Sequence, residues 1–564
     1  MLTFEDACAQ ITAPGMPLEL ADAEIRGRTY PIFVNAQNDL ASAFATAGAR
    51  GDLDFLVYED EHWSYADVVA HGHALAAALV EDYGIGKGDR VAIAMRNYPE
   101  WITAVVGIAA AGAVSVPLNA WWEADELDYG LTDSGARVAI VDAERLARIA
   151  APIARGDVEA IVVRSDARRD RAVGYDEVVT PGRAAPTIGI DPDDDATIMY
   201  TSGTTGPAKG AVHTHRNHCQ AIMAFGCRAV VGSAMAKAKA EAEGETPEPG
   251  PDRACFILAV PLFHITGFVP VMLGSFINGS KLVMMYKWDP RKALEHVEAE
   301  AVTNFVGVPT MVQDLLEVPD FDRYDTSSLR QVGGGGGPAA PELVRRVEST
   351  FSRGRPGLGY GMTETTAYGP QNAADDYVAR PRSTGRPVPV MALKVVDEQG
   401  EELPVGEQGE ICFYGPTVIR EYWNKPDATA EAFYDGWLRS GDLGRIDEDG
   451  FVYVEDRAKD MVIRAGENIG CIEVEAAIAD HPSVYENTVF GLPHERLGEE
   501  LACAIYLKDG AALDPDELRE FLSSRLAGFK IPTVIDIRDE MLPRSPQGKI
   551  LKRVVRDELA AARG

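Results

Sequence analysis

Short apolar, β-branched runs alternate with longer helical patterns along most of this chain, and this alternation limits the folds open to it. Each run is followed by a segment with helical spacing: 90–95 before the segment that begins at Pro99, 138–142 before 143–154, and 281–286 before 290–300. Such alternation is typical of βαβ units and of a largely parallel sheet covered by helices. We therefore predict an α/β fold for the main body.

The pattern changes after about residue 388, where strand-like runs follow one another closely. They occupy 392–397, 409–414 and 450–454 and are separated by Gly, Pro and Asp turn signals. The last hundred residues return to a mixed pattern, with expected helices at 472–480 and 515–526 and a strand at 501–507. A chain of 564 residues exceeds what one core supports. We predict a large N-terminal domain of mixed and parallel sheets with a β-rich subdomain, and a small, mobile α+β C-terminal domain.

One stretch, 233–253, breaks this pattern because it is rich in Ala, Glu, Gly and Pro and has no apolar face. Such composition is typical of a surface loop or a tolerated insertion. We expect a surface loop there.

Charge and cysteine usage exclude several classes of function. A net charge of -33 opposes binding to nucleic acid or to anionic lipid. The first ten residues are acidic and unlike a signal peptide, and no run approaches the ~20 apolar residues of a membrane span. The 7 cysteines contain no C-x-x-C pair, so neither a disulfide framework nor a zinc site is indicated. We expect a cytoplasmic protein with no integral membrane association.

A phosphate-binding loop is predicted at 197–210, TIMYTSGTTGPAKG. A strand-like run leads into six consecutive hydroxyl or glycine residues, after which a lysine adds positive charge: Thr201, Ser202, Gly203, Thr204, Thr205, Gly206 and then Lys209. Glycines let backbone N–H groups approach phosphate, and hydroxyls donate further hydrogen bonds. The tract matches neither G-x-x-x-x-G-K-[ST] nor G-x-G-x-x-G. It is a phosphate loop of another kind.

The tract TSGTTGPAKG resembles the signature loop of the AMP-forming acyl-CoA synthetase family, the adenylate-forming enzymes that include peptide-synthetase adenylation domains and beetle luciferase. Further tracts follow in the family's order along almost the whole chain. They are PLFH at 261–264, GGGP at 335–338, GYGMTET at 359–365, SGDLG at 440–444, DRAKDMVIRAGENI at 456–469 and PRSPQGKILKR at 543–553.

This resemblance implies ATP, Mg²⁺ and coenzyme A as substrates and cofactors, and it assigns residues to the nucleotide. The adenine and phosphate residues would be Gly335, Gly336, Gly337, Tyr360, Gly361, Met362 and Thr363. Asp442 would hold the ribose, and Arg457 would make a second ribose or phosphate contact. Glu364 would bind the metal, since a carboxylate suits a hard cation that bridges phosphates. Lys549 would neutralise charge between the attacking carboxylate and the α-phosphate.

The same resemblance implies two half-reactions separated by a rotation of the small domain. Lys459 matches the family's hinge, which sets domains at 1–458 and 459–564. Gly466, Glu467 and Asn468 would face coenzyme A. Here the chain departs from the family's usual pattern, because Gly470 and Cys471 follow GENI where relatives often carry bulkier or hydroxyl residues.

The acid is expected to be bulky and apolar. By resemblance His264 lines the acyl pocket and helps to admit the carboxylate, with Phe268, Val308, Met311 and Gly334 around it. The glycine run 333–337 removes side-chain bulk, and no cation is evident for a second carboxylate. A medium- or long-chain fatty acid or a bulky aromatic or alicyclic acid is predicted.

Two alternatives stay open at this point. The acceptor thiol could be the phosphopantetheine of a separate carrier protein instead of coenzyme A. A non-catalytic nucleotide-binding protein is the other reading, although Lys549, Glu364 and Asp442 are all present. The state of assembly, a homodimer included, is also open.

Overall fold

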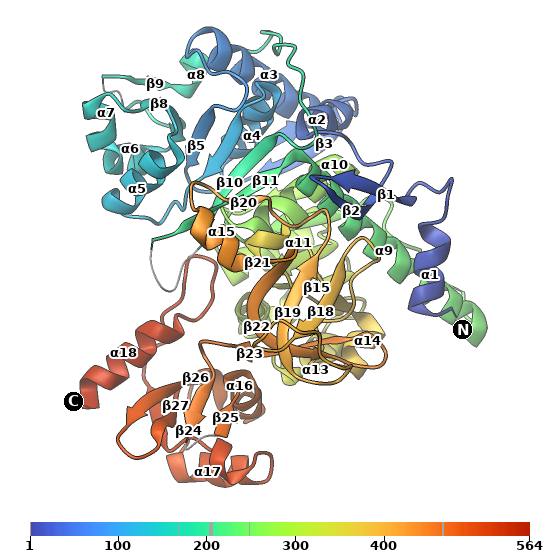
Figure 1. The fold of residues 1–564 in the computed structure, drawn as a ribbon, viewed down its shortest axis with the longest axis vertical. Coiled ribbons are helices and arrows are strands. Elements are labelled where there is room, and N and C mark those ends of the chain that lie inside the picture. Colours follow the sequence, from blue (N-terminus) through green and yellow to red (C-terminus); the bar gives the residue numbers. More distant parts are fainter. Residues whose placement is uncertain (1, 168–169, 202–206, 247–248, 465–466, 564) are drawn as a thin grey trace.

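The computed structural model describes residues 2–167, 170–201, 207–246, 249–464 and 467–563. Two eight-stranded sheets form the main body, and a five-stranded third sheet adjoins them (Figure 1). A two-stranded sheet lies near the N-terminus, and a further five-stranded sheet belongs to the C-terminal domain. The α/β prediction for the main body is confirmed.

The first large sheet has the order β20-β11-β10-β6-β5-β7-β8-β9, and its central strands are parallel. The strands are β20 Glu421–Tyr422, β11 Lys209–Thr214, β10 Asp195–Thr201, β6 Val114–Pro117, β5 Arg90–Ala94, β7 Val138–Val141, β8 Glu159–Val162 and β9 Ala172–Gly174. Its helices are α4 Pro99–Ala110, α5 Ala124–Ser134, α6 Ala143–Arg148, α7 Ala150–Arg155 and α8 Tyr175–Val178.

The second large sheet has the order β17-β16-β15-β14-β12-β13-β3-β4. Its strands are β17 Gln371–Ala373, β16 Arg355–Gly359, β15 Gln331–Gly335, β14 Asn304–Gly307, β12 Cys255–Leu258, β13 Lys281–Met284, β3 Asp54–Tyr58 and β4 Glu61–Ser64. Helices of this part of the chain are α2 Leu40–Gly48, α3 Tyr65–Glu81, α9 His215–Glu243, α10 Gly274–Asn278, α11 Pro290–Glu300, α12 Pro309–Leu316, α13 Pro341–Thr350 and α14 Ala374–Ala379.

The third sheet forms the β-rich region that the sequence predicts after about residue 388. It contains β18 Ala392–Val396, β19 Gly409–Tyr414, β21 Phe433–Tyr434, β22 Trp437–Ile446 and β23 Val452–Arg457, with α15 Pro426–Ala432 beside them. At the N-terminus, α1 Phe4–Ile11 packs on α9, and β1 Leu20–Ile25 pairs with β2 Arg28–Phe33.

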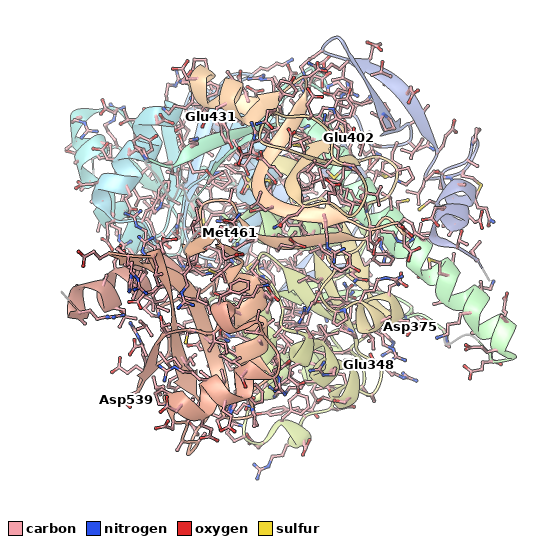
Figure 2. The ribbon with its side chains drawn as sticks, turned by 60° about the horizontal axis from the view of Figure 1, so that its bottom comes forward. Glu348, Asp375, Glu402, Glu431, Met461 and Asp539 are labelled. Atoms are coloured by element: carbon pink, nitrogen blue, oxygen red, sulfur yellow. The ribbon has the colours of Figure 1, made fainter. Side chains whose placement is uncertain are left out.

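The C-terminal domain has its own sheet and its own core, which begins at Val462. Its elements are β24 Val462–Arg464, β25 Glu467–Ile469, α16 Cys471–Ala479, β26 Val484–His494, β27 Gly498–Leu507, α17 Pro515–Ser523, β28 Val534–Arg538 and α18 Lys552–Arg563. Met461 lies where this domain meets the rest of the molecule (Figure 2).

Two expectations about helices were wrong. The segment 233–253 is not a loop throughout, because α9 continues to Glu243 and ends at Gly244, whose φ of 76° is left-handed. Ala, Lys and Glu are strong helix formers, so this tract extends the helix without an apolar face. The helix expected at 143–154 is two helices that meet at Ile149. Pro152 is the cause, because proline fits only the first turn of a new helix.

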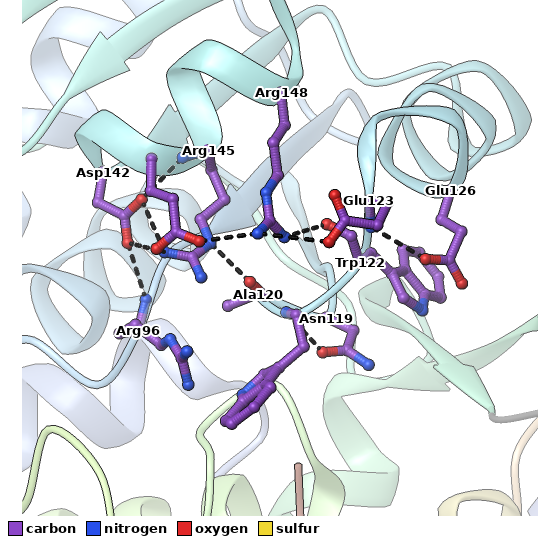
Figure 3. A network of polar contacts seen from close by, with 11 residues as sticks. Arg96, Asn119, Ala120, Trp122, Glu123, Glu126, Asp142, Arg145 and Arg148 are labelled. Carbon is purple, nitrogen blue, oxygen red and sulfur yellow. Dashed lines mark hydrogen bonds and ion pairs between the residues drawn. The ribbon is translucent and has the colours of Figure 1, made fainter. Parts of the chain in front are cut away.

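Buried charge fixes the loop that follows β6. Arg145, at the start of α6, donates to the carbonyl of Ala120 at 2.6 Å and pairs with Asp142 at 3.0 Å (Figure 3). Arg148 holds the Trp122 carbonyl of the same loop at 2.6 Å. Asp142 also accepts from the N–H of Arg96, which follows β5, at 3.2 Å. The segments that follow the carboxyl ends of β5, β6 and β7 are thereby tied together.

The helix α9 is the one described helix that length and composition would allow to cross a membrane. Its first half belongs to the protein core, where His215, His218 and Ala221 are buried.

Candidate active site

The predicted phosphate loop joins two antiparallel strands. Thr201 ends β10, Lys209 begins β11, and the two residues are opposite each other in the register. Ser202, Gly203, Thr204, Thr205 and Gly206 lie outside the described residues. The ammonium group of Lys209 lies 5.2 Å from the ring centroid of Tyr422.

Glu364 is fixed by that same tyrosine. It lies in the short 3-10 turn Thr363–Thr365, is 7% exposed, and accepts a hydrogen bond of 2.6 Å from the Tyr422 hydroxyl. Burial raises the pKa of this carboxyl, and the Tyr422 hydrogen bond opposes that shift. Lys209, Tyr422 and Glu364 therefore form one connected group, which the sequence did not predict because nothing marked Tyr422.

Tyr360, Asp442 and Arg457 form a second group. The Tyr360 hydroxyl donates to Asp442 Oδ2 at 2.6 Å, and Arg457 Nε lies 3.4 Å from Asp442 Oδ1. Asp442 on β22 is the register partner of Arg457 on β23, so the sheet itself sets this pairing. Behind Tyr360, a Cβ on Gly361 would lie 2.3 Å from the Ala367 carbonyl oxygen, so only glycine fits there.

The glycine run 333–337 has a backbone cause that corrects our reading of it. A Cβ on Gly333 would lie 1.9 Å from the Gly357 carbonyl oxygen, one on Gly334 1.8 Å from that of Gly307, and one on Gly335 2.6 Å from that of Gly359. The neighbouring strands β14 and β16 thus exclude side chains at these positions. The run by itself is no sign of a roomy acyl pocket.

Lys549 of the small domain reaches the end of this glycine run. Its Cε and Nζ lie 3.2 and 3.5 Å from the point that a Cβ on Gly336 would occupy, and Gly336 has a φ of 81°. Burial, with the nearby charge of Arg457, lowers the pKa of Lys549 to about 8. Gly336 therefore leaves the space that the lysine fills.

His264 faces the same charge. Burial and the positive charge of Lys549 lower its pKa to about 3, so it is neutral at physiological pH. The Thr266 N–H donates to His264 Nδ1 at 3.3 Å, which places the ring proton on Nε2. His264 can therefore donate one hydrogen bond without adding charge.

The residues predicted for the acyl pocket do not share one lining. Phe268 is fully buried between Trp101 and His218, at centroid distances of 5.5 and 5.4 Å. Val308 and Met311 face Gly548, the residue before Lys549. Gly334 borders a small apolar pocket, which Val312 and Leu343 also line.

A buried histidine pair supports the 3-10 turn, and the sequence did not predict it. His213 Nε2 donates to the Thr363 carbonyl at 2.8 Å, and the Thr197 hydroxyl lies 3.2 Å from His213 Nδ1 and 2.9 Å from His218 Nε2. Burial lowers the pKa of His213 to about 4, so the ring is neutral. Strand β10 is thus connected to the Thr363–Glu364 segment.

The residues predicted for the hinge and for coenzyme A follow Arg457 along the chain, and the charge of Lys459 acts on Asp442. Lys459 is in a turn that follows β23, where the N–H groups of Asp460 and Met461 both donate to the Arg457 carbonyl. Glu467 and Asn468 are exposed on β25, and Gly466 lies outside the described residues.

A magnesium ion would find few protein ligands here. Within the described ranges no group of three His, Cys, Asp or Glu side chains is arranged to hold a metal. Glu364 offers one carboxylate. This fits Mg²⁺, because that ion commonly takes one or two carboxylates and completes its shell with phosphate oxygens and water.

Comparisons with known proteins identify the family. Residues 44–423 match the family model described as AMP-binding enzyme, and residues 473–549 match the AMP-binding enzyme C-terminal domain. A feruloyl-CoA synthase of Amycolatopsis sp is 37% identical over 87% of this chain and 93% of its own length. The long-chain-fatty-acid–CoA ligase FadD13 of Mycobacterium tuberculosis is 34% identical over 89% and 94%. The crystal structure of ATP-bound MatB from Rhodopseudomonas palustris superposes with a TM-score of 0.79 at 30% identity, covering 93% of this chain and 100% of that one.

Proposed function

This chain belongs to the AMP-binding enzyme family, and from that premise we propose that it activates a carboxylic acid with ATP and passes the acyl group to coenzyme A. The observation that carries the proposal is the position of Lys549. A lysine from the small domain fills the space above Gly336, in the electrostatic range of Asp442, Arg457 and His264. The activity is that of an AMP-forming acid–thiol ligase.

In the first half-reaction a carboxylate oxygen attacks the α-phosphorus of ATP, and the bond to pyrophosphate breaks. Lys549 would supply positive charge to the oxygens that gain charge in this step. With a pKa of about 8 it is mostly protonated at neutral pH. Neutral His264 could donate through Nε2–H to the acid without repelling Lys549.

The nucleotide would be held by the two connected groups. Asp442, oriented by the Tyr360 hydroxyl, would accept hydrogen bonds from the ribose, and Arg457 would lie beside it. Glu364 would hold Mg²⁺, which supplies charge neutralisation on the phosphates when bound. Lys209 and the residues of the loop after Thr201 would bind the phosphates.

In the second half-reaction the thiol sulfur attacks the acyl carbon, the thiol proton is lost, and AMP leaves. Lys549 occupies the site in this structure, while Glu467 and Asn468 are exposed on the small domain. We propose that rotation about Lys459 withdraws Lys549 and brings the β24–β25 hairpin to the site. The domain boundary at 458 and 459 belongs to this proposal.

The substrate is proposed to be an apolar acid, either a medium- or long-chain fatty acid or a bulky aromatic or alicyclic acid. The relatives' names include both a feruloyl and a long-chain fatty acyl substrate. Val308 and Met311 place apolar side chains beside Gly548, the residue before Lys549.

Pyrophosphate release tests the proposal. The protein is mixed with ATP, Mg²⁺ and a panel of carboxylic acids, with and without coenzyme A. We expect release with one class of acid and a thioester only when coenzyme A is present. If adenylation occurs but coenzyme A accepts no acyl group, a carrier protein becomes the acceptor. If no acid in the panel triggers release while ATP still binds, the non-catalytic nucleotide-binding reading gains support.

A further inference from the structure

The helix α12 holds the Lys549 loop through two residues on one face. Thr310 and Asp314 are four residues apart, so their side chains lie one above the other on the helix. The Thr310 hydroxyl donates to the Gly548 carbonyl at 2.8 Å. Asp314 accepts from Arg544 Nη1 at 3.1 and 3.3 Å. Both contacts cross from the large domain to the small one.

Arg544 and Gly548 belong to one closed hairpin that carries Lys549. The Ser545 N–H donates to the Lys549 carbonyl at 2.7 Å, and the Leu551 N–H donates to the Pro543 carbonyl at 2.7 Å. Arg544 and Ile550 form a bridge across its base. A hairpin held at its base and beside its tip has little freedom to turn, so the position of the Lys549 backbone is set by α12.

Asp314 also gathers two other donors. The Tyr485 hydroxyl of β26 donates to Oδ1 at 2.7 Å, and Trp288 Nε1 of the large domain donates to Oδ2 at 2.9 Å. The neighbouring Gln313 side chain donates to the Tyr485 carbonyl. One carboxylate therefore connects the large domain to the strand and to the hairpin of the small domain.

The ion pair is shielded from water. The exposed fraction is 17% for the Arg544 side chain, 11% for Asp314 and 3% for Glu486, which accepts from Arg544 Nη2 at 2.6 Å. Burial disfavours the Arg544 charge, but the two carboxylates outweigh it and raise the pKa of the guanidinium. Shielded, charge-assisted hydrogen bonds depend strongly on geometry.

Glu486 makes this contact reversible. It belongs to the small domain, so it would travel with Arg544 if that domain turned, and the guanidinium would stay paired. Asp314 would keep its hydrogen bond from Trp288. Breaking a buried ion pair is costly when it leaves a buried charge without a partner. Here neither charge would be left in that state.

We infer that Asp314 is a positioning residue for Lys549. Asp314 holds the small domain in the orientation for adenylation and releases it for acyl transfer. This inference rests on the proposed function. It assigns to Asp314 an effect on the first half-reaction alone, because the contacts it makes would be broken in the second.

Separate assays of the half-reactions test the inference. Asp314→Asn keeps the size and shape of the side chain, but it replaces one acceptor oxygen with an amide NH2 and removes the charge that pairs with Arg544. We expect acid-dependent ATP–pyrophosphate exchange to fall by about 10- to 100-fold, toward the low end for loss of a buried charged partner, because Glu486 still pairs with Arg544. Transfer to coenzyme A from supplied acyl-AMP should stay within about twofold of wild type, since an intact second step needs no Asp314.

A matched control crosses the same domain interface at its surface. Arg345 pairs with Asp480 at 3.2 Å, but its side chain is 58% exposed. Arg345→Ala should leave both half-reactions unchanged, because exposed ion pairs contribute little.

A second variant replaces Asp314→Asn if that protein does not fold. Tyr485→Phe removes one donor to Asp314 and keeps the ring, so it should lower pyrophosphate exchange by a smaller amount and leave acyl transfer nearly unchanged.

Equal losses in both half-reactions, or no loss in either, would overturn the role of Asp314. Wild-type protein in which no acid supports ATP–pyrophosphate exchange would instead contradict the proposed function. The two failures are therefore distinguishable in the same assays.

Discussion

The hydroxyl of Tyr360 donates a hydrogen bond of 2.6 Å to Asp442, and this contact joins the end of β16 to the third sheet. Asp442 is 8% exposed, and burial raises the pKa of its carboxyl. The Tyr360 hydrogen bond and the charges of Arg457 and Lys459 favour the ionised form. Asp442 is thus held as an oriented acceptor before a nucleotide binds.

Substitution of Asp442 should weaken ATP use. Asp442→Ala removes two acceptor oxygens, so we expect the KM for ATP to rise about tenfold or more, as for loss of hydrogen bonds to a charged group. Tyr360→Phe should raise it less, because the carboxylate remains. Steady-state kinetics at saturating acid measure this. Asp435→Ala, at an 80% exposed carboxylate, is the control. An unchanged KM for ATP in Asp442→Ala would reject the ribose assignment.

The pH dependence of adenylation should follow Lys549. Its ammonium form is the one that neutralises charge, and its pKa is lowered to about 8. Adenylation should therefore decline as pH rises through about 8, where an ordinary lysine would keep its charge to about 10. Measuring the rate of ATP–pyrophosphate exchange from about pH 6.5 to about pH 9.5 would show this decline as the alkaline limb of the pH profile.

Two variants separate Lys549 from other groups. Lys549→Arg should lose the alkaline limb, because a guanidinium stays charged, although its size lowers the rate. Lys549→Ala should suppress adenylation and leave transfer from supplied acyl-AMP largely intact. An alkaline limb that persists in Lys549→Arg would assign it to another residue.

Mg²⁺ use should depend on Tyr422, although this residue is not predicted to touch the metal. Its hydrogen bond to Glu364 opposes the burial that raises the pKa of that carboxyl. In Tyr422→Phe the pKa of Glu364 should rise further, and a protonated carboxyl is a poor metal ligand. We expect the Mg²⁺ concentration for half-maximal adenylation to rise about three- to tenfold, more at pH 6 than at pH 8.

The control for this prediction is Tyr434→Phe, at a tyrosine that is 54% exposed. It should not alter the Mg²⁺ requirement. A Tyr422→Phe protein with the same requirement at both pH values would show that Glu364 is not the metal ligand or that its ionisation does not matter.

The sequence predicted elements well where the local pattern was sufficient and failed where distant contacts decided. Helix α11 begins and ends where its proline and its periodicity indicated. The glycines at 333–335 were interpreted from their own side chains, but the cause lies in the backbones of β14 and β16. Asp314 carried no signal at all, because its partners Tyr485 and Arg544 are 171 and 230 residues away along the chain. The order of the motifs predicted the candidate site. The contacts that support it come from tertiary packing, which no local pattern predicts.

The proposed hinge at Lys459 should be sensitive to backbone restriction. The Arg457 carbonyl accepts from both Asp460 and Met461, so the turn after β23 is already tight. Lys459→Pro fixes one backbone angle and also restricts Ala458. If the small domain turns here, transfer to coenzyme A should fall about tenfold or more while adenylation, which uses the orientation seen in this structure, falls less. Single-turnover measurements of both steps compare the variant with Lys459→Ala, which removes the side chain and leaves the backbone free. Transfer that is unaffected in Lys459→Pro, or equally slowed in Lys459→Ala, would place the pivot elsewhere.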